Sequence, residues 1–307
     1  MPDHTARERR HGLAFGLGAY LIWGLFPLYW PLLEPAGPLE ILANRIVWSF
    51  VFLLIVLLLR REWSWVRPLL GDRRRLLMLT AAAVTVSLNW GVYIYGVNSG
   101  QVVQTSLGYF INPLVSVVFG VVLLGEHLRR LQWVAVGLGA IAVVVLTLDY
   151  GHLPWIALVL AFSFGTYGLV KKKLSMGAVE SLSVETAILV LPALAFLVWA
   201  TVAGQSTLTT EGPAHASIMM TTGVVTAVPL LLFGAAALRV PLVWVGLMQY
   251  LAPVMQFAIG VGIDHEPMPA SRWVGFLLVW GALAIVVVDS VRARTTRDTA
   301  ALTPVME

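Results

Sequence analysis

Ten apolar runs of about 20 residues follow one another along this chain, and little sequence remains between them. A run of that length, wound as a helix, can cross a hydrocarbon layer of roughly 30 Å. Each run should be a helix, because backbone polar groups in lipid must find their partners within the segment. The expected spans are residues 12–33, 39–59, 75–97, 102–124, 130–148, 153–171, 181–201, 217–238, 242–263 and 272–291. The sequence therefore predicts an all-α integral membrane protein with ten transmembrane helices.

The composition excludes most classes of soluble enzyme. Apolar residues make up 59% of the 307 and charged residues only 12%, about half of the charged share of a soluble domain. The longest connection, near residues 202–216, is too short for a catalytic or nucleotide-binding domain. The chain has no cysteine and no Walker A, G-x-S-x-G or H-E-x-x-H pattern. We therefore expect neither enzymatic activity nor a cofactor.

The chain also repeats itself at a constant shift of 140 residues. Five identities mark the repeat: Pro113 and Pro253, Gly120 and Gly260, Glu126 and Glu266, Trp133 and Trp273, and Asp149 and Asp289. The two halves, residues 12–150 and 151–291, each hold five expected spans, so the second half should be inverted in the membrane. Inverted repeats are a recurring plan of secondary transporters, with the substrate site where the halves meet.

The basic residues lie almost entirely on one side of the expected bilayer. With a cytoplasmic N-terminus, 18 of the 20 Lys and Arg residues face the cytoplasm, as the positive-inside rule requires. Both tails, residues 1–11 and 292–307, are then cytoplasmic, and this basic side should contact anionic lipid head groups. The net charge of +4 thus indicates membrane topology and not nucleic-acid binding.

Arg45 is the basic residue that lies within an expected span, about six residues from its start. An arginine at the centre of a bilayer costs about 2.5 kcal/mol or more, and less nearer the interface. Its side chain could reach the outer head groups or pair with Glu40. Alternatively, it could line a wet cavity and meet an anionic or carboxylate-bearing solute. Trp48, at helical spacing from Arg45, favours the cavity.

Aromatic and amide side chains recur at helical spacing in several spans. We name ten candidate solute contacts: Arg45, Trp23, Trp48, Asn89, Trp90, Tyr93, Tyr109, Asn112, Gln249 and Gln256. Amides facing lipid would lack partners, so these should point inward, either to bond neighbouring helices or to line a cavity. Prolines free carbonyls and bend helices, which suits gates but is also common in static membrane helices. Pro113, Pro229 and Pro253 are the candidate gating positions.

Few acids lie deep in the expected spans. Glu185 is four or five residues inside the seventh span, and Glu40 lies at an outer boundary. We expect these carboxylates to be caps or boundary charges, so their placement argues against proton coupling and leaves the coupling ion open. Asp264, His265 and Glu266 could ligate a metal in principle, but we expect a solvated turn there and no metal site.

Several segments resemble a known family. Residues 19–24 (AYLIWG) and 40–49 (EILANRIVWS) are similar to the first two spans of the bacterial RarD group, and 106–114 (SLGYFINPL), 125–126 and 130–133 are similar to later parts of it. That group is a branch of the EamA family in the drug/metabolite transporter superfamily. The resemblance implies ten helices in two inverted EamA units, an inner-membrane location and export of small metabolites or drugs. Asn44 departs from the family pattern, where histidine is familiar, which leaves substrate preference open.

Together these features predict an inner-membrane permease that moves a small metabolite or drug-like solute, outward, by alternating access. Spans 130–148 and 272–291 should act as support and offer a face for a homodimer. Two other classes stay open: a membrane-embedded enzyme acting on lipid-linked substrates, and a sensor without transport. The enzyme would need acids, histidines or serines clustered near one interface, and the sensor a soluble signalling domain. Solute flux into sealed vesicles separates both from a permease.

Overall fold

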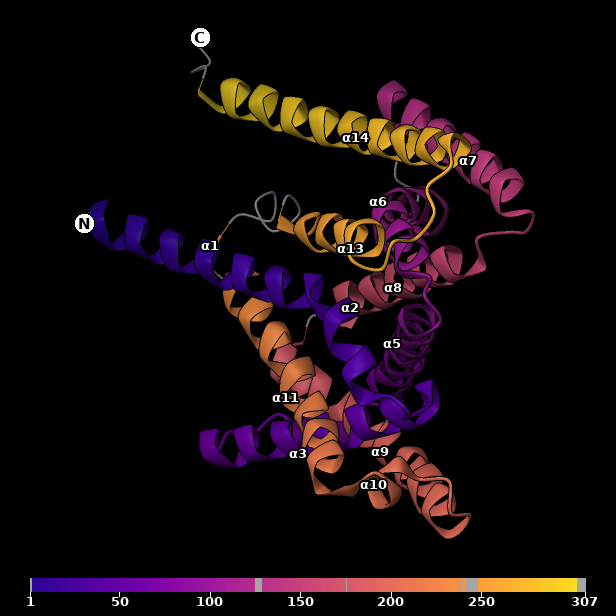
Figure 1. Ribbon diagram of the computed structural model, residues 1–307. Coiled ribbons are helices and arrows are strands. Elements are labelled where there is room, and N and C mark those ends of the chain that lie inside the picture. The colour runs from indigo at the N-terminus through magenta and orange to yellow at the C-terminus, as the bar shows by residue number, and fades with distance from the viewer. Residues whose placement is uncertain (1, 125–128, 175, 238, 241–247, 303–307) are drawn as a thin grey trace.

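The computed structural model describes residues 2–124, 129–174, 176–237, 239–240 and 248–302, and the regular elements within these ranges are all helical (Figure 1). In the first half they are α1 (Pro2–Gly24), α2 (Phe26–Tyr29), η1 (Trp30–Leu33), α3 (Pro38–Arg60), α4 (Val66–Leu70), α5 (Arg73–Asn98), α6 (Val102–Leu124) and α7 (Arg130–Tyr150). In the second half they are α8 (Trp155–Leu174), α9 (Ala178–Val202), α10 (Thr207–Thr210), α11 (Gly212–Ala237), α13 (Leu251–Gly262) and α14 (Ala270–Leu302).

Seven described helices are long and apolar enough to cross a membrane, and the number is eight if the bent pair over residues 8–33 is one span. Two shorter apolar helices, Trp155–Lys171 within α8 and Leu251–Gly262, stand where the sixth and ninth spans are expected. Part of that ninth span, residues 242–247, lies outside the described residues. A multi-pass, all-helical protein is therefore confirmed, whereas ten spans remain a prediction.

The first expected span is broken. We expected one helix over residues 12–33, but α1 ends at Gly24, and α2 and η1 continue at an angle of 45°. The expectation of a continuous helix is wrong because Pro27 has no N–H to donate to the carbonyl of Trp23, four residues earlier. The apolar pattern continues through the break, which is why it did not reveal the bend.

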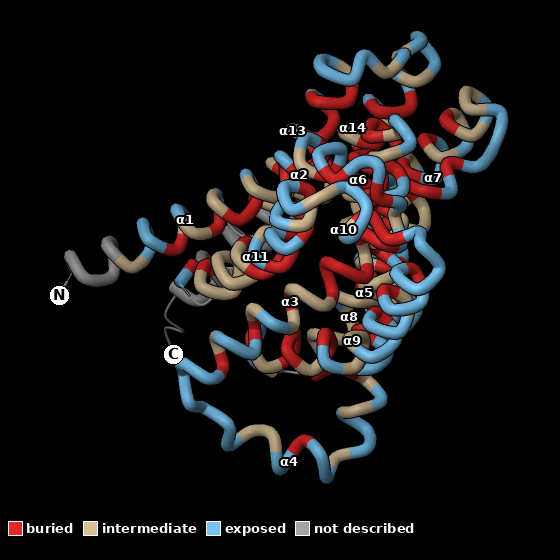
Figure 2. Tube along the Cα trace, turned by 60° about the horizontal axis from the view of Figure 1, so that its bottom comes forward, coloured by how far each residue is buried: buried red, intermediate tan, exposed pale blue. Residues whose placement is uncertain are grey.

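Helices of the first 150 residues pack largely on helices of the remainder. α8 packs on both α5 and α6, α3 packs on α9 and α11, and α1 packs on α11 and α13. α7 lies alongside α14, with α6 next to α13 (Figure 1). Exposed residues line the outer sides of these helices and most of α4 (Figure 2). The interior, where the two sets of helices meet, is therefore the place for a site.

Ion pairs fasten both ends of the α7–α14 pair. Arg129 Nη2 lies 2.8 Å from Asp289 Oδ2, and Arg272 Nε lies 2.9 Å from Asp149 Oδ2. The two aspartates are one of the identities that mark the 140-residue repeat. Each aspartate pairs with an arginine at the start of the other helix: Asp149 of α7 pairs with Arg272, and Asp289 of α14 pairs with Arg129.

Candidate functional site

A cavity of about 550 Å³ lies between the two sets of helices. Volumes of about 300–1,000 Å³ are typical of sites that take small molecules. Its wall is mostly apolar and aromatic, and it comes from α1, α2, α3, α5 and α6 on one side and from α8, α9, α11 and α13 on the other. Such a wall with a few polar groups is the usual make-up of a small-molecule site.

Nine of the ten candidate solute contacts border this cavity. They are Trp23, Arg45, Asn89, Trp90, Tyr93, Tyr109, Asn112, Gln249 and Gln256. Side chains that are far apart in the sequence are thus gathered around one space, as their placement on inward helix faces suggested. Their contact with a solute remains a prediction.

Trp48 is the exception, because it is not among the residues that line the cavity. The backbone of α3 at Trp48 and Ser49 lies directly against Gly223 of α11, so closely that a side chain at Gly223 would not fit. We placed Trp48 on the same helix face as Arg45, but α3 packs against its neighbour at this turn. The contact of Trp48 with a solute therefore stays a prediction, without support from the lining of this cavity.

Arg45 is buried at the cavity wall and does not reach the outer head groups, since its exposed fraction is 3%. Its guanidinium carbon lies 4.1 Å from the ring centre of Trp90, 5.0 Å from Trp30 and 5.7 Å from Phe26. Such cation–π contacts are worth about 2 kcal/mol when desolvated. The Nε and Nη1 atoms of Arg45 have no hydrogen-bond partner among the described residues. The rings hold the cation while leaving its donors free.

Glu40 does not pair with Arg45. Its Oε1 atom accepts hydrogen bonds from Ser206 Oγ at 3.0 Å and from the backbone N–H of Thr207 at 2.8 Å. The carboxylate therefore fastens the start of α3 to the start of α10. Arg45 therefore neither reaches the outer head groups nor pairs with Glu40. Of the explanations that we considered, only its position at the cavity fits the structure.

Asn89 is fully engaged in bonds between helices. Its Nδ2 donates to the carbonyl of Leu160 at 3.1 Å and to Ser163 Oγ at 3.0 Å, and its Oδ1 accepts from Tyr109 OH at 3.2 Å. These contacts join α5 to α8 and α6. For this amide, interhelical bonding accounts for the inward position.

Other polar atoms near the cavity remain without partners. In the part of the chain that the structure describes, Tyr93 OH, Asn112 Oδ1 and Gln256 Oε1 are buried and make no hydrogen bond. Buried polar groups normally have partners, so these atoms mark places where a bound molecule or water could bond. Together with Arg45 they provide donors and acceptors around one aromatic chamber.

Gln256 also bonds the break in the first span. Its Nε2 donates to the carbonyl of Trp23 at 3.0 Å, the group that Pro27 leaves without its helical donor. Gly24 permits the close approach of α13, because an added Cβ would lie 2.7 Å from Met255 Sδ. Gln256 is therefore both a cavity residue and a fastener between α13 and the bend.

The three prolines lie inside helices. Pro113 is within α6 and Pro229 within α11, while Pro253 is in the first turn of α13 and borders the cavity. Their role as gates remains a prediction. The structure adds Pro27 to them as the proline at which a long apolar segment bends.

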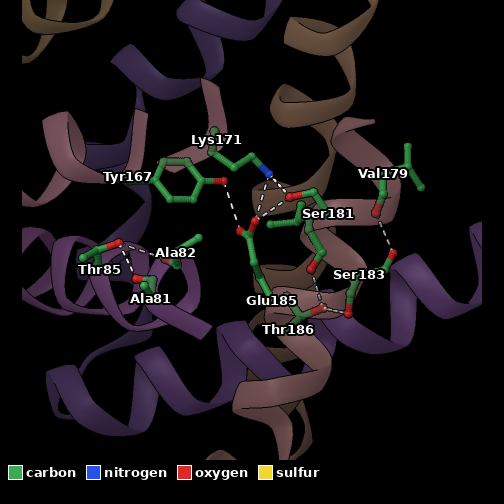
Figure 3. A network of polar contacts seen from close by, with 11 residues as sticks. Ala81, Ala82, Thr85, Tyr167, Lys171, Val179, Ser181, Ser183, Glu185 and Thr186 are labelled. Atoms are coloured by element: carbon green, nitrogen blue, oxygen red, sulfur yellow. Dashed lines mark hydrogen bonds and ion pairs between the residues drawn. The ribbon is translucent and has the colours of Figure 1, made fainter. Parts of the chain in front are cut away.

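A buried cluster around Glu185, which the sequence did not lead us to expect, lies between α8 and α9 (Figure 3). Glu185 accepts from Lys171 Nζ at 2.8 Å, from Ser181 Oγ at 2.6 Å and from Tyr167 OH at 3.1 Å. We treated Lys171 as a loop charge and Glu185 as a boundary charge, but Lys171 borders the cavity and Glu185 is completely buried. The spacing of four residues between Tyr167 and Lys171, and between Ser181 and Glu185, is the signal that could have revealed it.

The turn at residues 264–266 is only partly solvated. Asp264 and His265 are exposed, but Glu266 Oε1 accepts from the backbone N–H of Val103 at 3.0 Å. Burial raises the pKa of the Glu266 carboxyl to about 7, against the lowering effect of its backbone hydrogen bonds. Glu266 thus caps the first turn of α6. No group of three metal-ligand side chains gathers within the described ranges.

Residues 10–148 match the EamA-like transporter family. The chain is 57% identical over 291 residues to Protein RarD of Streptomyces exfoliatus, covering 94% of this chain and 92% of that protein. The chain belongs to the EamA-like transporter family. This finding confirms the resemblance to the RarD group that the short segments indicated.

A second relative and a solved structure extend the comparison. The chain is 41% identical over 288 residues to Uncharacterized transporter YojE of Bacillus subtilis (strain 168), covering 93% of this chain and 96% of that one. A solved structure described as "Crystal structure of protein" gives a TM-score of 0.54 at 14% identity, covering 89% of this chain and 97% of that chain. At that identity the likeness concerns the fold alone. This EamA-family protein is a multi-pass membrane transporter.

Proposed function

We propose that this transporter carries a small solute with an anionic group across the bacterial inner membrane, outward, by alternating access. The observation that carries the proposal is Arg45, a buried cation at the cavity wall. Two of its nitrogen atoms have no hydrogen-bond partner, and no carboxylate within the described ranges pairs with it. A buried charge without a partner is strongly disfavoured. An anion bound in the cavity would compensate it, and the ring faces of Trp23 and Trp90 would pack on the rest of the solute.

Alternating access requires two halves that can exchange roles, and the packing pattern supports such halves. If residues 12–150 and 151–291 are repeats, α1, α3, α5, α6 and α7 correspond to α8, α9, α11, α13 and α14. When each helix is exchanged for its counterpart, the contact between α5 and α8 becomes the contact between α11 and α1, and both are observed. In the same way, the contact between α6 and α8 becomes the contact between α13 and α1. The remaining contacts join a helix to its own counterpart, so the exchange leaves them unchanged: α3 with α9, α6 with α13 and α7 with α14. Inverted repeats related by a pseudo-two-fold axis produce this exchange.

The ends of the cavity suggest which side is open. It reaches the exposed residues Gly168 and Ala178, where α8 ends and α9 begins. At its other end the buried side chains of Phe26 and Trp30 pack together in the aromatic cluster around η1. Because lysines follow at residues 171–173, the positive-inside rule makes the open end cytoplasmic. The structure then corresponds to an inward-facing state that loads its solute from the cytoplasm.

The proposal is tested first by finding the solute and then by measuring its flux. Cells lacking the protein should accumulate a metabolite that cells overproducing it release, and proteoliposomes should show saturable counterflow of that metabolite. Arg45→Ala should lower this flux at least about tenfold by removing the compensating charge. Arg45→Lys, which keeps the charge but not the planar donors, should retain part of it.

Arg60→Ala is the matched control, because it removes an exposed arginine from the last turn of the same helix. Its flux should equal that of the unmodified protein. Unchanged flux of the identified solute in Arg45→Ala, with the purified variant monodisperse, would remove Arg45 from the mechanism. Transport of a solute without any anionic group would contradict the proposal that the substrates are anionic.

A further inference from the structure

The Lys171–Glu185 pair is divided between the cavity and the interior. Both Lys171 and Tyr167 line the cavity, whereas the side chain of Glu185 is 1% exposed and that of Lys171 is 23% exposed. The carboxylate is held by three donors, one of them charged, and they converge on it from α8 and from its own helix α9 (Figure 3). The ammonium group is therefore the member of the pair that a molecule in the cavity can reach.

Lys171 is the cation that compensates Glu185. α9 packs on α3, α5 and α11, and the α8 side chains of Tyr167 and Lys171 bond to it. Among the described residues, none of the other titratable groups of these five helices forms a hydrogen bond or an ion pair with Glu185: Glu40, Arg45, Arg60, Arg73, Arg74, Arg75, Tyr93, Tyr95, Lys173, Glu180 and His215. Arg45 lies over aromatic rings, Glu40 is bonded to Ser206, and His215 is bonded to Thr207.

An anion in the cavity and the Glu185 carboxylate would thus compete for one ammonium group. Taking Lys171 away from an ionised Glu185 would leave a buried carboxylate without a countercharge, which is strongly disfavoured. A proton on Glu185 removes that obstacle, because the neutral acid needs only hydrogen bonds, and Ser181 and Tyr167 are already in place to make them.

We propose that Glu185 is a proton-binding site and that its protonation releases Lys171 to bind an anionic group of the solute. The inference rests on the proposed function, since it assumes that the cavity takes an anion. The step is balanced: one proton from water binds a Glu185 carboxylate oxygen, the ion pair with Lys171 opens, and Lys171 keeps its own proton. The cluster is neutral before the step, and it is neutral again once the proton and a monoanion are bound.

Proton and solute therefore bind together and leave together. Outward transport then carries a proton with each anion and is driven by the gradient of the accumulated solute. The two cations of the cavity have different tasks. Arg45 has no carboxylate partner among the described residues, whereas Lys171 becomes available only when Glu185 is neutral.

The experiment uses naphthalene-2-sulfonate, an anion whose charge does not change with pH, and the neutral naphthalene-2-sulfonamide of similar shape. Binding to the full chain in nanodiscs is measured by calorimetry at about pH 6 and about pH 8, in buffers of different ionisation enthalpy, so that protons taken up are counted. The unmodified protein should take up about one proton per anion at both pH values, and it should therefore bind the sulfonate about a hundredfold more weakly at the higher pH. The sulfonamide should bind without proton uptake.

Two variants separate the members of the pair. Glu185→Gln should bind the sulfonate equally at both pH values and without proton uptake, because Lys171 is then always released. Lys171→Gln should bind it about tenfold more weakly at the lower pH and lose the pH dependence. Glu180→Gln and Lys173→Gln change the same charges on the same two helices outside the cluster, and they should behave like the unmodified protein.

The outcomes distinguish this inference from the proposed function. Sulfonate binding by the unmodified protein without proton uptake overturns the proton site and leaves the anion cavity standing, whatever the variants do. Undiminished proton uptake in Glu185→Gln also overturns it, because the proton then binds elsewhere. If the unmodified protein binds no sulfonate at either pH, the proposal that the cavity takes an anionic solute is contradicted. The proposed release of Lys171 is then contradicted as well, because it depends on that anion.

Discussion

Two asparagines at the cavity wall differ in how their amides are occupied. Asn89 makes three interhelical hydrogen bonds, whereas Asn112 Oδ1 is buried without a partner in the described chain. Asn89→Leu should therefore lower the free energy of unfolding by about 1 kcal/mol and leave the KM for the solute nearly unchanged. Asn112→Leu should do the reverse, raising KM severalfold with little loss of stability. Thermal unfolding in micelles and counterflow in proteoliposomes measure the two effects, and equal changes in both variants would contradict the assignment.

Glu266 should make the stability of the protein depend on pH. Its pKa is about 7 in the folded protein, raised from the ordinary 4.5 by burial. Between about pH 4.5 and pH 7 the folded state keeps a proton that the unfolded state has lost, so the free energy of unfolding should fall as pH rises through this window. Glu266→Gln should flatten that fall, because its amide oxygen still accepts from Val103 but no longer ionises.

The measurement is the midpoint of thermal unfolding across this pH range. Glu34→Gln, at an exposed carboxylate, changes the net charge equally and serves as control. An unaltered pH profile in Glu266→Gln would show that the buried cap does not cause the dependence.

At this scale the sequence identified which residue types belong inside, but not what each one contacts. An arginine or amide within an apolar run must face the interior for energetic reasons, and nine of ten candidates do border the cavity. Whether an amide is free depends on neighbours more than 70 residues away, as for Asn89 and Leu160. Trp48 does not border the cavity, and the apolar pattern of a helix could not show this because it does not reveal where another helix will cross. Glu185 and Lys171 were missed because their pairing appears only when α8 and α9 pack.

At the scale of elements, the bend after α1 depends on two residues from opposite halves of the chain. Pro27 deprives the Trp23 carbonyl of its helical donor, and Gln256 of α13 supplies another at 3.0 Å. Gln256→Leu should lower the free energy of unfolding by about 1–2 kcal/mol, because it leaves a buried carbonyl without a partner. In a Pro27→Ala background the loss should be smaller, since residue 27 then has an N–H for Trp23.

A double-mutant cycle of these changes, followed by unfolding in micelles, isolates the coupling between them. Gln249→Leu is the matched control, because Gln249 also borders the cavity but, among the described residues, makes no hydrogen bond to α1. Equal losses for Gln256→Leu in both backgrounds would show that Gln256 does not serve the bend. The bend itself could have been expected from Pro27, because a proline inside a long helix kinks it, but hydropathy alone joined the segment into one span.

At the scale of the whole molecule, hydropathy predicted the positions of most helices, whereas the inverted repeat remains a prediction. Every expected span coincides with a described helix over at least part of its length, because backbone satisfaction in lipid permits little else. The bend was harder to foresee, because apolar residues continue through it although it divides the first span. From the sequence, the position of the cavity could be predicted only in general terms, as the region where the two halves of the chain meet. Its shape depends on side-chain packing that no pattern of apolar residues contains.

The proposed inverted arrangement leads to a prediction that concerns the whole chain. If the halves are inverted repeats, the connection after α3 and the corresponding connection after α9 must lie on opposite faces of the membrane. Ser64 and Gln205 are exposed residues in these two connections, and the chain has no cysteine to interfere. In intact cells, Gln205→Cys should react with a membrane-impermeant maleimide, while Ser64→Cys should react only after the membrane is opened. Protection of both or labelling of both would place them on one face, and two halves on the same side of the bilayer could not alternate around a shared cavity.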